Sequence, residues 1–280
     1  ILRQRLRFYF QTRRDGQPAR FMRWMVDLRL NEEEFIMAWA LVTGASSGIG
    51  QSVAIELSKN YDVILCGRNH ARLEETRKSL RGGGICLSLE LGEAETAQEA
   101  LSEALKSNGI CVEAFASCAG CMGLLPLRVS TPEKVRAMLE VNLLTPMMLT
   151  RVLVSRPINH GALKSIVFVS SNISNRGAKA FSAYGASKSG VDGMMRCLAV
   201  ELAPAVRVNS VLPGAVRTPM TEAIFSDSEV VKRMAATYPL GIGTPQAIAD
   251  AVAFLCSEKA TWITGQQLTV DGGRTINITG

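Results

Sequence analysis

The sequence is poor in the features that mark a disulfide-stabilised, metal-binding or membrane protein. Its seven cysteines are an odd number, which favours a reduced, intracellular and cytoplasmic chain over a disulfide framework. It has only two histidines, His70 and His160, and no second cysteine pair accompanies Cys118 and Cys121, so we predict no metal site. No apolar run reaches the roughly 18 residues that a membrane span needs.

A basic excess is missing from most of the chain, although the net charge is +6. Residues 1–24 hold seven arginines and one acid, Asp15, which accounts for that whole charge. The remainder is neutral, so we predict no nucleic-acid partner. We interpret residues 1–36 as a poorly ordered basic N-terminal extension, with Met37 as a natural alternative start. A partner- or lipid-contacting arm is an alternative, and an organelle transit peptide is disfavoured because the extension has no serine.

A glycine-rich turn joins a predicted strand at residues 35–42 to a predicted helix at residues 49–57. Gly44, Gly48 and Gly50 stand there in the spacing Gly-x-x-x-Gly-x-Gly, and their missing Cβ atoms let the main chain bend sharply. A pyrophosphate would then reach the free N–H groups at the helix N-terminus. A plain turn without a ligand is the alternative, but the features that follow favour a phosphate site.

Apolar strands and amphipathic helices alternate along the rest of the chain. Further strands are expected at residues 62–66, 84–89, 112–116, 165–169, 206–211 and 267–270, and further helices at 69–80, 94–106, 131–154, 182–202 and 245–256. This pattern predicts an α/β fold, a Rossmann-type doubly wound parallel sheet of about seven strands with helices on both faces. We expect Pro146 to kink or bound its helix. Because no linker or repeat divides residues 37–280, they would form a single dinucleotide-binding and catalytic domain.

Tyr184 and Lys188, in the motif Tyr-Gly-Ala-Ser-Lys, have the i, i+4 spacing that places both on one face of a helix. A cation near the phenol would stabilise the phenolate and lower the tyrosine pKa from about 10, giving a proton donor and acceptor near neutral pH. Ser170 and Ser171 follow a predicted strand, where α/β proteins build their sites. A surface Tyr/Lys pair without function is the alternative.

Four features together resemble the short-chain dehydrogenase/reductase family over about residues 38–274: the run Thr43–Gly50, the spacing of Ser171 and Tyr184, the Tyr-Gly-Ala-Ser-Lys motif and Pro213-Gly214. The resemblance implies hydride transfer between a nicotinamide cofactor and a carbonyl or secondary alcohol. It implies Tyr184 as general acid/base, and Lys188 as the group that binds the nicotinamide ribose and tunes Tyr184. It further implies that Ser171 polarises the carbonyl and that Asn142 supports a proton relay.

The predicted cofactor contacts combine the resemblance with the glycine-rich turn. They are Gly44, Ser46, Ser47, Gly48, Ile49, Gly50, Arg68, Glu90, Leu91, Ala119, Gly120, Tyr184, Lys188, Pro213, Gly214, Val216 and Thr218. Two positions depart from the family. Ser117 replaces an asparagine that commonly steadies the sheet, and Glu90 stands where an aspartate often binds the adenine amino group. We expect Ser117 to affect the local stability of the sheet. We expect the longer side chain of Glu90 to reach the adenine differently, and neither departure to change the chemistry.

The end of the second predicted strand lacks the acid with which chains that use NAD usually bind the ribose hydroxyls. Gly67 leaves space there, and the guanidinium of Arg68 can bind a 2′-phosphate, with Ser46 adding a hydroxyl contact. We therefore favour NADP(H) over NAD(H). The alternative is a solvated Arg68 that pairs with Glu74 or Glu75.

Several alternatives remain open at this level. Residues 220–236 would form a partly apolar substrate lid or buried core, and Cys118-x-x-Cys121 is either a coincidence or a redox pair. The tail at residues 238–273 most resembles 3-oxoacyl-[acyl-carrier-protein] reductases, a branch that also contains sugar, steroid and polyol dehydrogenases, so the small-molecule substrate is not identified. The family implies a homotetramer or homodimer, for which Met147, Met148, Met194 and Met195 are interface or core residues. A non-catalytic dinucleotide sensor or scaffold is the alternative function.

Overall fold

The computed structural model describes residues 38–278, which form a seven-stranded sheet in the order β3-β2-β1-β4-β5-β6-β7. Every pair of neighbouring strands is parallel. The strands are β1 (Trp39–Thr43), β2 (Asp62–Gly67), β3 (Gly84–Ser88), β4 (Val112–Ser117), β5 (Ser165–Val169), β6 (Arg207–Pro213) and β7 (Gln267–Val270). The predicted doubly wound parallel sheet is thereby confirmed, while the predicted extension at residues 1–36 lies outside the described residues.

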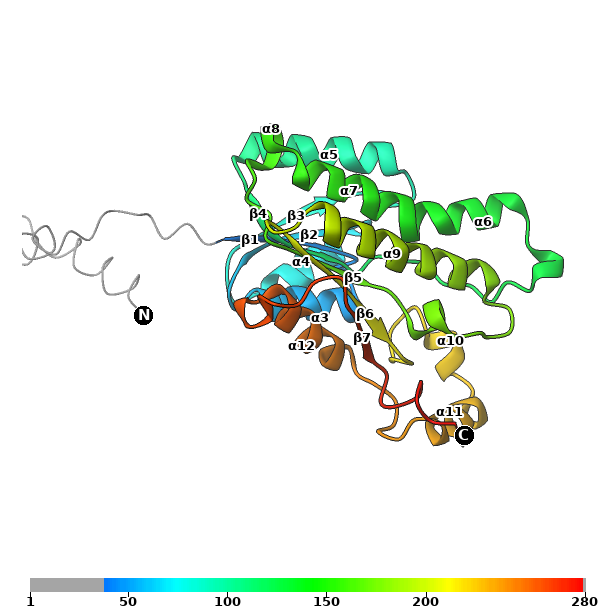
Figure 1. Cartoon of the computed structure of the whole chain (residues 1–280). Coiled ribbons are helices and arrows are strands. Elements are labelled where there is room, and N and C mark those ends of the chain that lie inside the picture. Colours follow the sequence, from blue (N-terminus) through cyan, green and yellow to red (C-terminus); the bar gives the residue numbers. More distant parts are fainter. Residues whose placement is uncertain (1–37, 279–280) are drawn as a thin grey trace, which may run out of the picture. The chain divides into compact units, whose positions relative to one another are not determined.

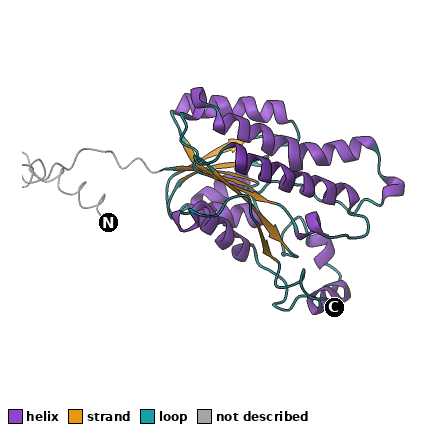
Figure 2. Ribbon diagram, viewed as in Figure 1, coloured by secondary structure: helices purple, strands orange, loops and turns teal. Residues whose placement is uncertain are grey.

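Helices cover both faces of this sheet (Figures 1 and 2). One face packs against α5 (Ala94–Asn108), α7 (Thr145–Val154) and α9 (Ser182–Glu201). The other packs against α3 (Gly48–Leu57), α4 (His70–Lys78) and α12 (Pro245–Cys256). Shorter helical segments are η1 (Leu127–Val129), α6 (Pro132–Leu139), η2 (Glu140–Leu144), α8 (Arg156–Asn159), η3 (Asn172–Asn175), α10 (Glu222–Phe225), α11 (Ser228–Ala236) and η4 (Glu258–Ala260).

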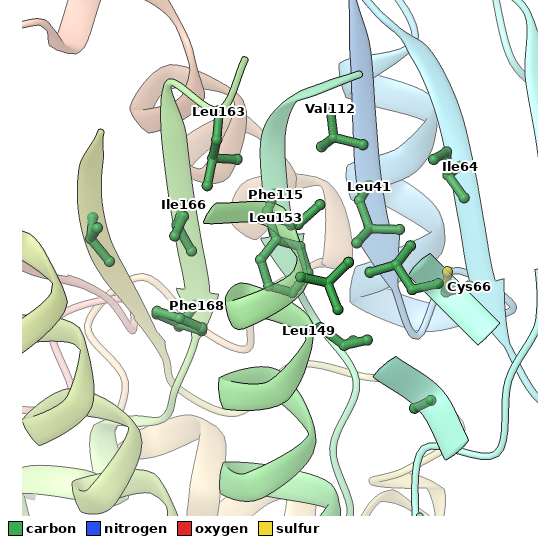
Figure 3. Close-up of a cluster of buried hydrophobic side chains, with 14 of the residues drawn as sticks. Leu41, Ile64, Cys66, Val112, Phe115, Leu149, Leu153, Leu163, Ile166 and Phe168 are labelled. Carbon is green, nitrogen blue, oxygen red and sulfur yellow. The ribbon is translucent and has the colours of Figure 1, made fainter. Parts of the chain in front are cut away.

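Alternation along the strands divides the core into two clusters, because successive side chains of a strand point to opposite faces. In β1, Leu41 belongs to the cluster beneath α5, α7 and α9, whereas Ala40 and Val42 belong to the cluster above α3 and α12. Figure 3 shows the first cluster, in which Leu149 and Leu153 of α7 lie over the sheet. Both faces of the sheet are therefore dry, as the continuous apolar strands predict.

The predicted helix at residues 131–154 is interrupted at η2, a π-helical turn that separates α6 from α7. Our expectation that Pro146 kinks or bounds its helix is confirmed, because α7 begins at Thr145, directly after η2. Pro146 stands in the first turn of α7, where its missing N–H removes no hydrogen bond. The extra residue of the π turn directs Asn142 inward, where it is buried, and such turns are frequent at functional sites.

By length and composition, one helix of the described residues, Pro132–Val154, is apolar enough to cross a membrane. Its residues Leu149, Val152 and Leu153 are buried against the sheet. A core helix and a membrane span share this composition, and the packing of Leu149 and Leu153 in Figure 3 shows that part of this helix belongs to the core.

Candidate active site

The predicted site residues gather at the carboxyl ends of the strands, on both sides of the point where the strand order reverses between β1 and β4. A cavity of about 290 Å³ opens there. Its lining includes twelve of the predicted cofactor contacts, namely Gly44, Ser46, Ser47, Gly48, Ile49, Gly50, Arg68, Glu90, Leu91, Ala119, Gly120 and Thr218. The turns after β1, β2, β3, β4 and β6 thus meet around one space.

The glycine-rich turn is shaped so tightly that side chains are excluded from it. Gly44 has a φ of +70°, and a Cβ there would lie 2.9 Å from the Cα of Ala119. A Cβ on Gly50 would lie 2.2 Å from the carbonyl oxygen of Gly44. Ser47, the N-cap of α3, makes no side-chain capping hydrogen bond, so it leaves the first N–H groups of the helix available to an anion.

The end of β2 leaves Arg68 exposed beside this cavity. A Cβ on Gly67 would lie 3.5 Å from the Oγ of Ser46, so the glycine-rich turn and the β2 turn are in contact. Glu74 pairs with Arg77 at 2.8 Å. Among the described residues, the ion pairs do not include Arg68, which disfavours the alternative in which Glu74 neutralises it.

The loop after β4 is fixed by a residue that our sequence reasoning missed. The Oγ1 of Thr43, the last residue of β1, accepts hydrogen bonds from the backbone N–H groups of Cys118 and Ala119, both at 3.2 Å. Thr43 is buried, and these bonds hold the loop beside the glycine-rich turn. Ser117 replaces the asparagine that commonly steadies the sheet in the family, and Thr43, on the neighbouring strand, fixes the loop that follows Ser117.

A second cavity, of about 410 Å³, adjoins the first and shares Ile49, Gly120 and Thr218 with it. The predicted catalytic residues Ser171, Tyr184 and Lys188 line it. The remaining predicted cofactor contacts, Pro213, Gly214 and Val216, lie on its wall.

Asn142, the fourth predicted catalytic residue, lines neither cavity. Its Nδ2 donates to the carbonyl of Cys121 and to the Oγ of Ser187, both at 2.9 Å, and its Oδ1 accepts from the N–H of Cys121 at 2.8 Å. The Ser187 hydroxyl in turn donates to the carbonyl of Tyr184 at 2.7 Å. Asn142 therefore joins the loop after β4 to the helix that carries Tyr184.

Burial dominates the ionisation of the two central side chains. It raises the pKa of Tyr184, with a hydrogen bond to Ser171 acting in the opposite direction. The prediction that Lys188 lowers this pKa is wrong: the Nζ of Lys188 donates to the carbonyl of Val169 at 2.9 Å and lies 6.0 Å from the centre of the tyrosine ring. Desolvation also lowers the pKa of Lys188 to about 8, although the charge of Asp192 opposes the shift. The site thus favours a neutral phenol.

The pair Cys118 and Cys121 has no features of an activated thiol. Burial raises the pKa of both side chains, and the thiolate is the reactive form in disulfide exchange. Both are free cysteines. Among residues 38–278, no group of three or more His, Cys, Asp or Glu side chains is arranged to hold a metal ion.

Asp271 is another residue that our sequence reasoning missed. Its Oδ2 accepts from the Nδ2 of Asn172, at 3.2 Å, and from the N–H of Thr275, at 2.8 Å. A Cβ on Gly214 would lie 2.7 Å from the Cβ of Asp271, so this carboxylate stands directly behind the wall of the second cavity. It thereby connects the C-terminal segment to the loops that follow β5 and β6.

The sequence and the fold are similar to those of known oxidoreductases. A family model described as enoyl-(acyl carrier protein) reductase matches residues 44–275. Human (3R)-3-hydroxyacyl-CoA dehydrogenase is 34% identical over 252 residues, which cover 84% of this chain and 95% of that protein.

Two solved structures are similar as well. A Beutenbergia cavernae protein assigned as an NAD(P)-dependent gluconate 5-dehydrogenase, with bound NADP, has 31% identity and a TM-score of 0.80 over 86% of this chain and 98% of that one. A 4-hydroxyisoleucine dehydrogenase complexed with NADH has 27% identity and a TM-score of 0.79 over 85% of this chain and 99% of that one.

This chain belongs to the short-chain dehydrogenase/reductase family. It is an oxidoreductase that acts on CH–OH or C=O groups of small molecules with a nicotinamide cofactor. The narrower resemblance to 3-oxoacyl-[acyl-carrier-protein] reductases stays a prediction.

Proposed function

We propose that this enzyme reduces a carbonyl compound to a secondary alcohol with NADPH, and that Tyr184 donates the proton. The observation that carries the proposal is the shared boundary of the two cavities, which brings the glycine-rich turn and the Ser171–Tyr184 pair to opposite ends of one space. A dinucleotide bound at the glycine-rich end would place its nicotinamide at the junction lined by Ile49, Gly120 and Thr218.

The residues fit this cofactor because the glycine-rich turn and the first turn of α3 can bind a diphosphate. The bare first turn of α3 faces the cavity beside three glycines that leave no side chain in the way. Lys188 lies buried at the second cavity and can donate to ribose hydroxyls, and the wall at Pro213–Val216 would contact the carboxamide. The bound nicotinamide supplies the hydride.

Tyr184 is the proton donor in this proposal because its raised pKa keeps the phenol protonated near neutral pH. Ser171 would donate a hydrogen bond to the carbonyl oxygen and so stabilise the negative charge that develops there. Asn142 contributes by position, since it fixes the loop at Cys121 against α9. A carbonyl that has received a hydride would take the phenolic proton, and Tyr184 would regain a proton from solvent.

We also propose NADP(H) as the cofactor, since the exposed Arg68 lines the first cavity, where it could bind a 2′-phosphate, and no acid follows β2. Assembly as a homotetramer or homodimer and a cytoplasmic location belong to the same proposal. So does the domain at residues 37–280.

The test is the substitution Tyr184→Phe, measured with a panel of ketones and aldehydes as substrates. We expect NADPH affinity and fold to be unchanged, and kcat to fall by at least about 100-fold, because positioned proton donors contribute roughly 10²–10⁴-fold. Tyr61→Phe, the same change at a tyrosine that lines neither cavity, is the matched control and should keep turnover within a few-fold. Unchanged turnover in Tyr184→Phe would refute the role of Tyr184, and NADPH binding without turnover of any carbonyl would favour the dinucleotide sensor.

A further inference from the structure

The second cavity has two chemically different ends. Ser171 and Tyr184 form a polar end next to the predicted nicotinamide position. The rest of the lining is largely apolar and includes Met122, Leu124, Phe181 and, from the predicted lid, Ile224, Phe225 and Met234. A substrate whose carbonyl reaches Ser171 and Tyr184 must therefore place its remaining atoms against apolar side chains.

The lining offers no cation to a carboxylate or phosphate group of a substrate. Among the described residues that line this cavity, Lys188 is the single charged side chain, and its Nζ is buried and donates to the carbonyl of Val169. It also lies at the cofactor end of the cavity, close to Gly120. A buried anion without a partner is strongly disfavoured, so the apolar end excludes charged groups.

The polar side chains of the wall are already hydrogen-bonded within the protein. The Oγ1 of Thr221 donates to the carbonyl of Val216 at 2.7 Å, and the Nδ2 of Asn172 donates to Asp271. The hydroxyl of Tyr238 accepts from the N–H of Ala215 at 3.0 Å. The wall therefore has few free side-chain partners for the several hydroxyl groups of a sugar, and each hydroxyl group left unpaired would cost about tenfold in affinity.

The predicted lid at residues 220–236 supports the same conclusion. Helix α11 buries none of its residues, and yet Met234 of this helix faces the cavity. Phe225 of α10 is buried beneath the ring contact that it makes with the guanidinium of Arg217, 4.8 Å away. An apolar substrate chain would cover Met234, and this burial would favour binding.

We propose that the substrate is an uncharged carbonyl compound with an extended apolar chain or ring beside its carbonyl, and not a sugar acid or other polyhydroxylated acid. This inference rests on the proposed function, because Ser171 and Tyr184 fix which end of the molecule reacts. Of the substrate classes that the sequence leaves open, it favours the acyl and steroid compounds over the sugars and polyols.

The test compares kcat/KM with NADPH for three sets of compounds: 2-alkanones of increasing length, the same chains ending in a carboxylate, and a keto sugar acid. We expect kcat/KM to rise about threefold to fourfold with each added methylene until the cavity is filled, since each buried CH₂ is worth about 0.8 kcal/mol. The terminal carboxylates should be at least about tenfold poorer than the alkanones of equal length.

The substitution Ile224→Arg gives a second arm, because it places a cation on the apolar wall. It should reduce the gain per methylene and improve the chain-terminal carboxylates relative to the alkanones. Ala223→Arg is the matched control: this residue is exposed, adjacent and absent from the cavity lining, so the chain-length series should be unchanged.

A preference for the sugar acid, or no dependence on chain length, would overturn the inference while leaving the proposed function intact. If no carbonyl compound oxidises NADPH at all, the proposed function and the inference both fail. An Ile224→Arg variant that leaves the series unchanged would show that the lid wall does not contact substrate, and it would also overturn the inference.

Discussion

The choice between NADPH and NADH depends on Arg68, and the substitution Arg68→Asp tests it most directly. Arg68 is exposed at the edge of the first cavity, next to Gly67 and within reach of the turn that carries Ser46. A hydrogen bond to a charged group contributes about 1.5–3 kcal/mol, but solvent screens an exposed guanidinium. The lower end of that range corresponds to a preference for NADPH of about tenfold.

In Arg68→Asp the carboxylate would repel the 2′-phosphate and could accept hydrogen bonds from the ribose hydroxyls instead. We expect the preference for NADPH to collapse or reverse, and the NADPH preference of the wild type to weaken as salt is added. The assay is the ratio of kcat/KM for NADPH to that for NADH. Arg72→Asp, an exposed position on α4 outside the cavity lining, is the matched control and should retain the preference. A wild type that favours NADH would refute the reasoning.

Gly50→Ala should weaken NADPH binding by at least about tenfold, because its Cβ would meet the carbonyl of Gly44. Fluorescence titration would measure this affinity, and Gly177→Ala, at a position with open space around it, is the control. Leu153→Ala should lower the free energy of unfolding by about 2–5 kcal/mol in urea melts, since its fully buried side chain would leave a cavity; a loss below about 1 kcal/mol would contradict this packing. Lys188 has a pKa of about 8 when folded against an ordinary 10.5, so the unfolded chain binds more protons at this residue between these values, and the contribution of Lys188 to stability should rise with pH there by up to about 3 kcal/mol. Buried thiols with raised pKa values act in the opposite direction, so the measurement is the stability of the wild type relative to Lys188→Met, which should rise with pH.

Local patterns were enough to predict the layers and most boundaries of the fold. Strand and helix limits after Asp62 lie within two residues of those expected, with the exception of the helix that η2 interrupts. Buried parallel strands read as continuous apolar runs, which is why they were visible in the sequence. A π turn leaves no comparable mark, because it adds one residue without changing the apolar pattern, and Pro146 indicated a helix boundary there but not the type of turn.

The site was predictable where residue type and spacing decide the geometry, as in the glycine-rich turn and the Tyr184–Lys188 pair. The effect of Lys188 on Tyr184 was not, since it depends on where the ammonium points and how deeply the phenol is buried. Thr43 was missed because its partners are distant in sequence, and the link from Asp271 to Asn172 was missed for the same reason. Thr43 belongs to the glycine-rich run that the sequence analysis singled out, but no neighbouring residue predicts its hydrogen bonds to residues 118 and 119.

The π turn at Glu140–Leu144 also constrains how this chain can change length. A π turn holds about one residue more than an α turn, so removing a single residue from η2 would restore regular α-helical pairing while α6 and α7 keep nearly the same faces. The change would fall on η2 itself: the bulge that brings Asn142 to the loop at Cys121 would close, while Met138 would stay in the small cluster that it shares with Ala183 and Tyr184. A stretch that looks like surplus helix is therefore intolerant of deletion, and helix length here is a property of the active site.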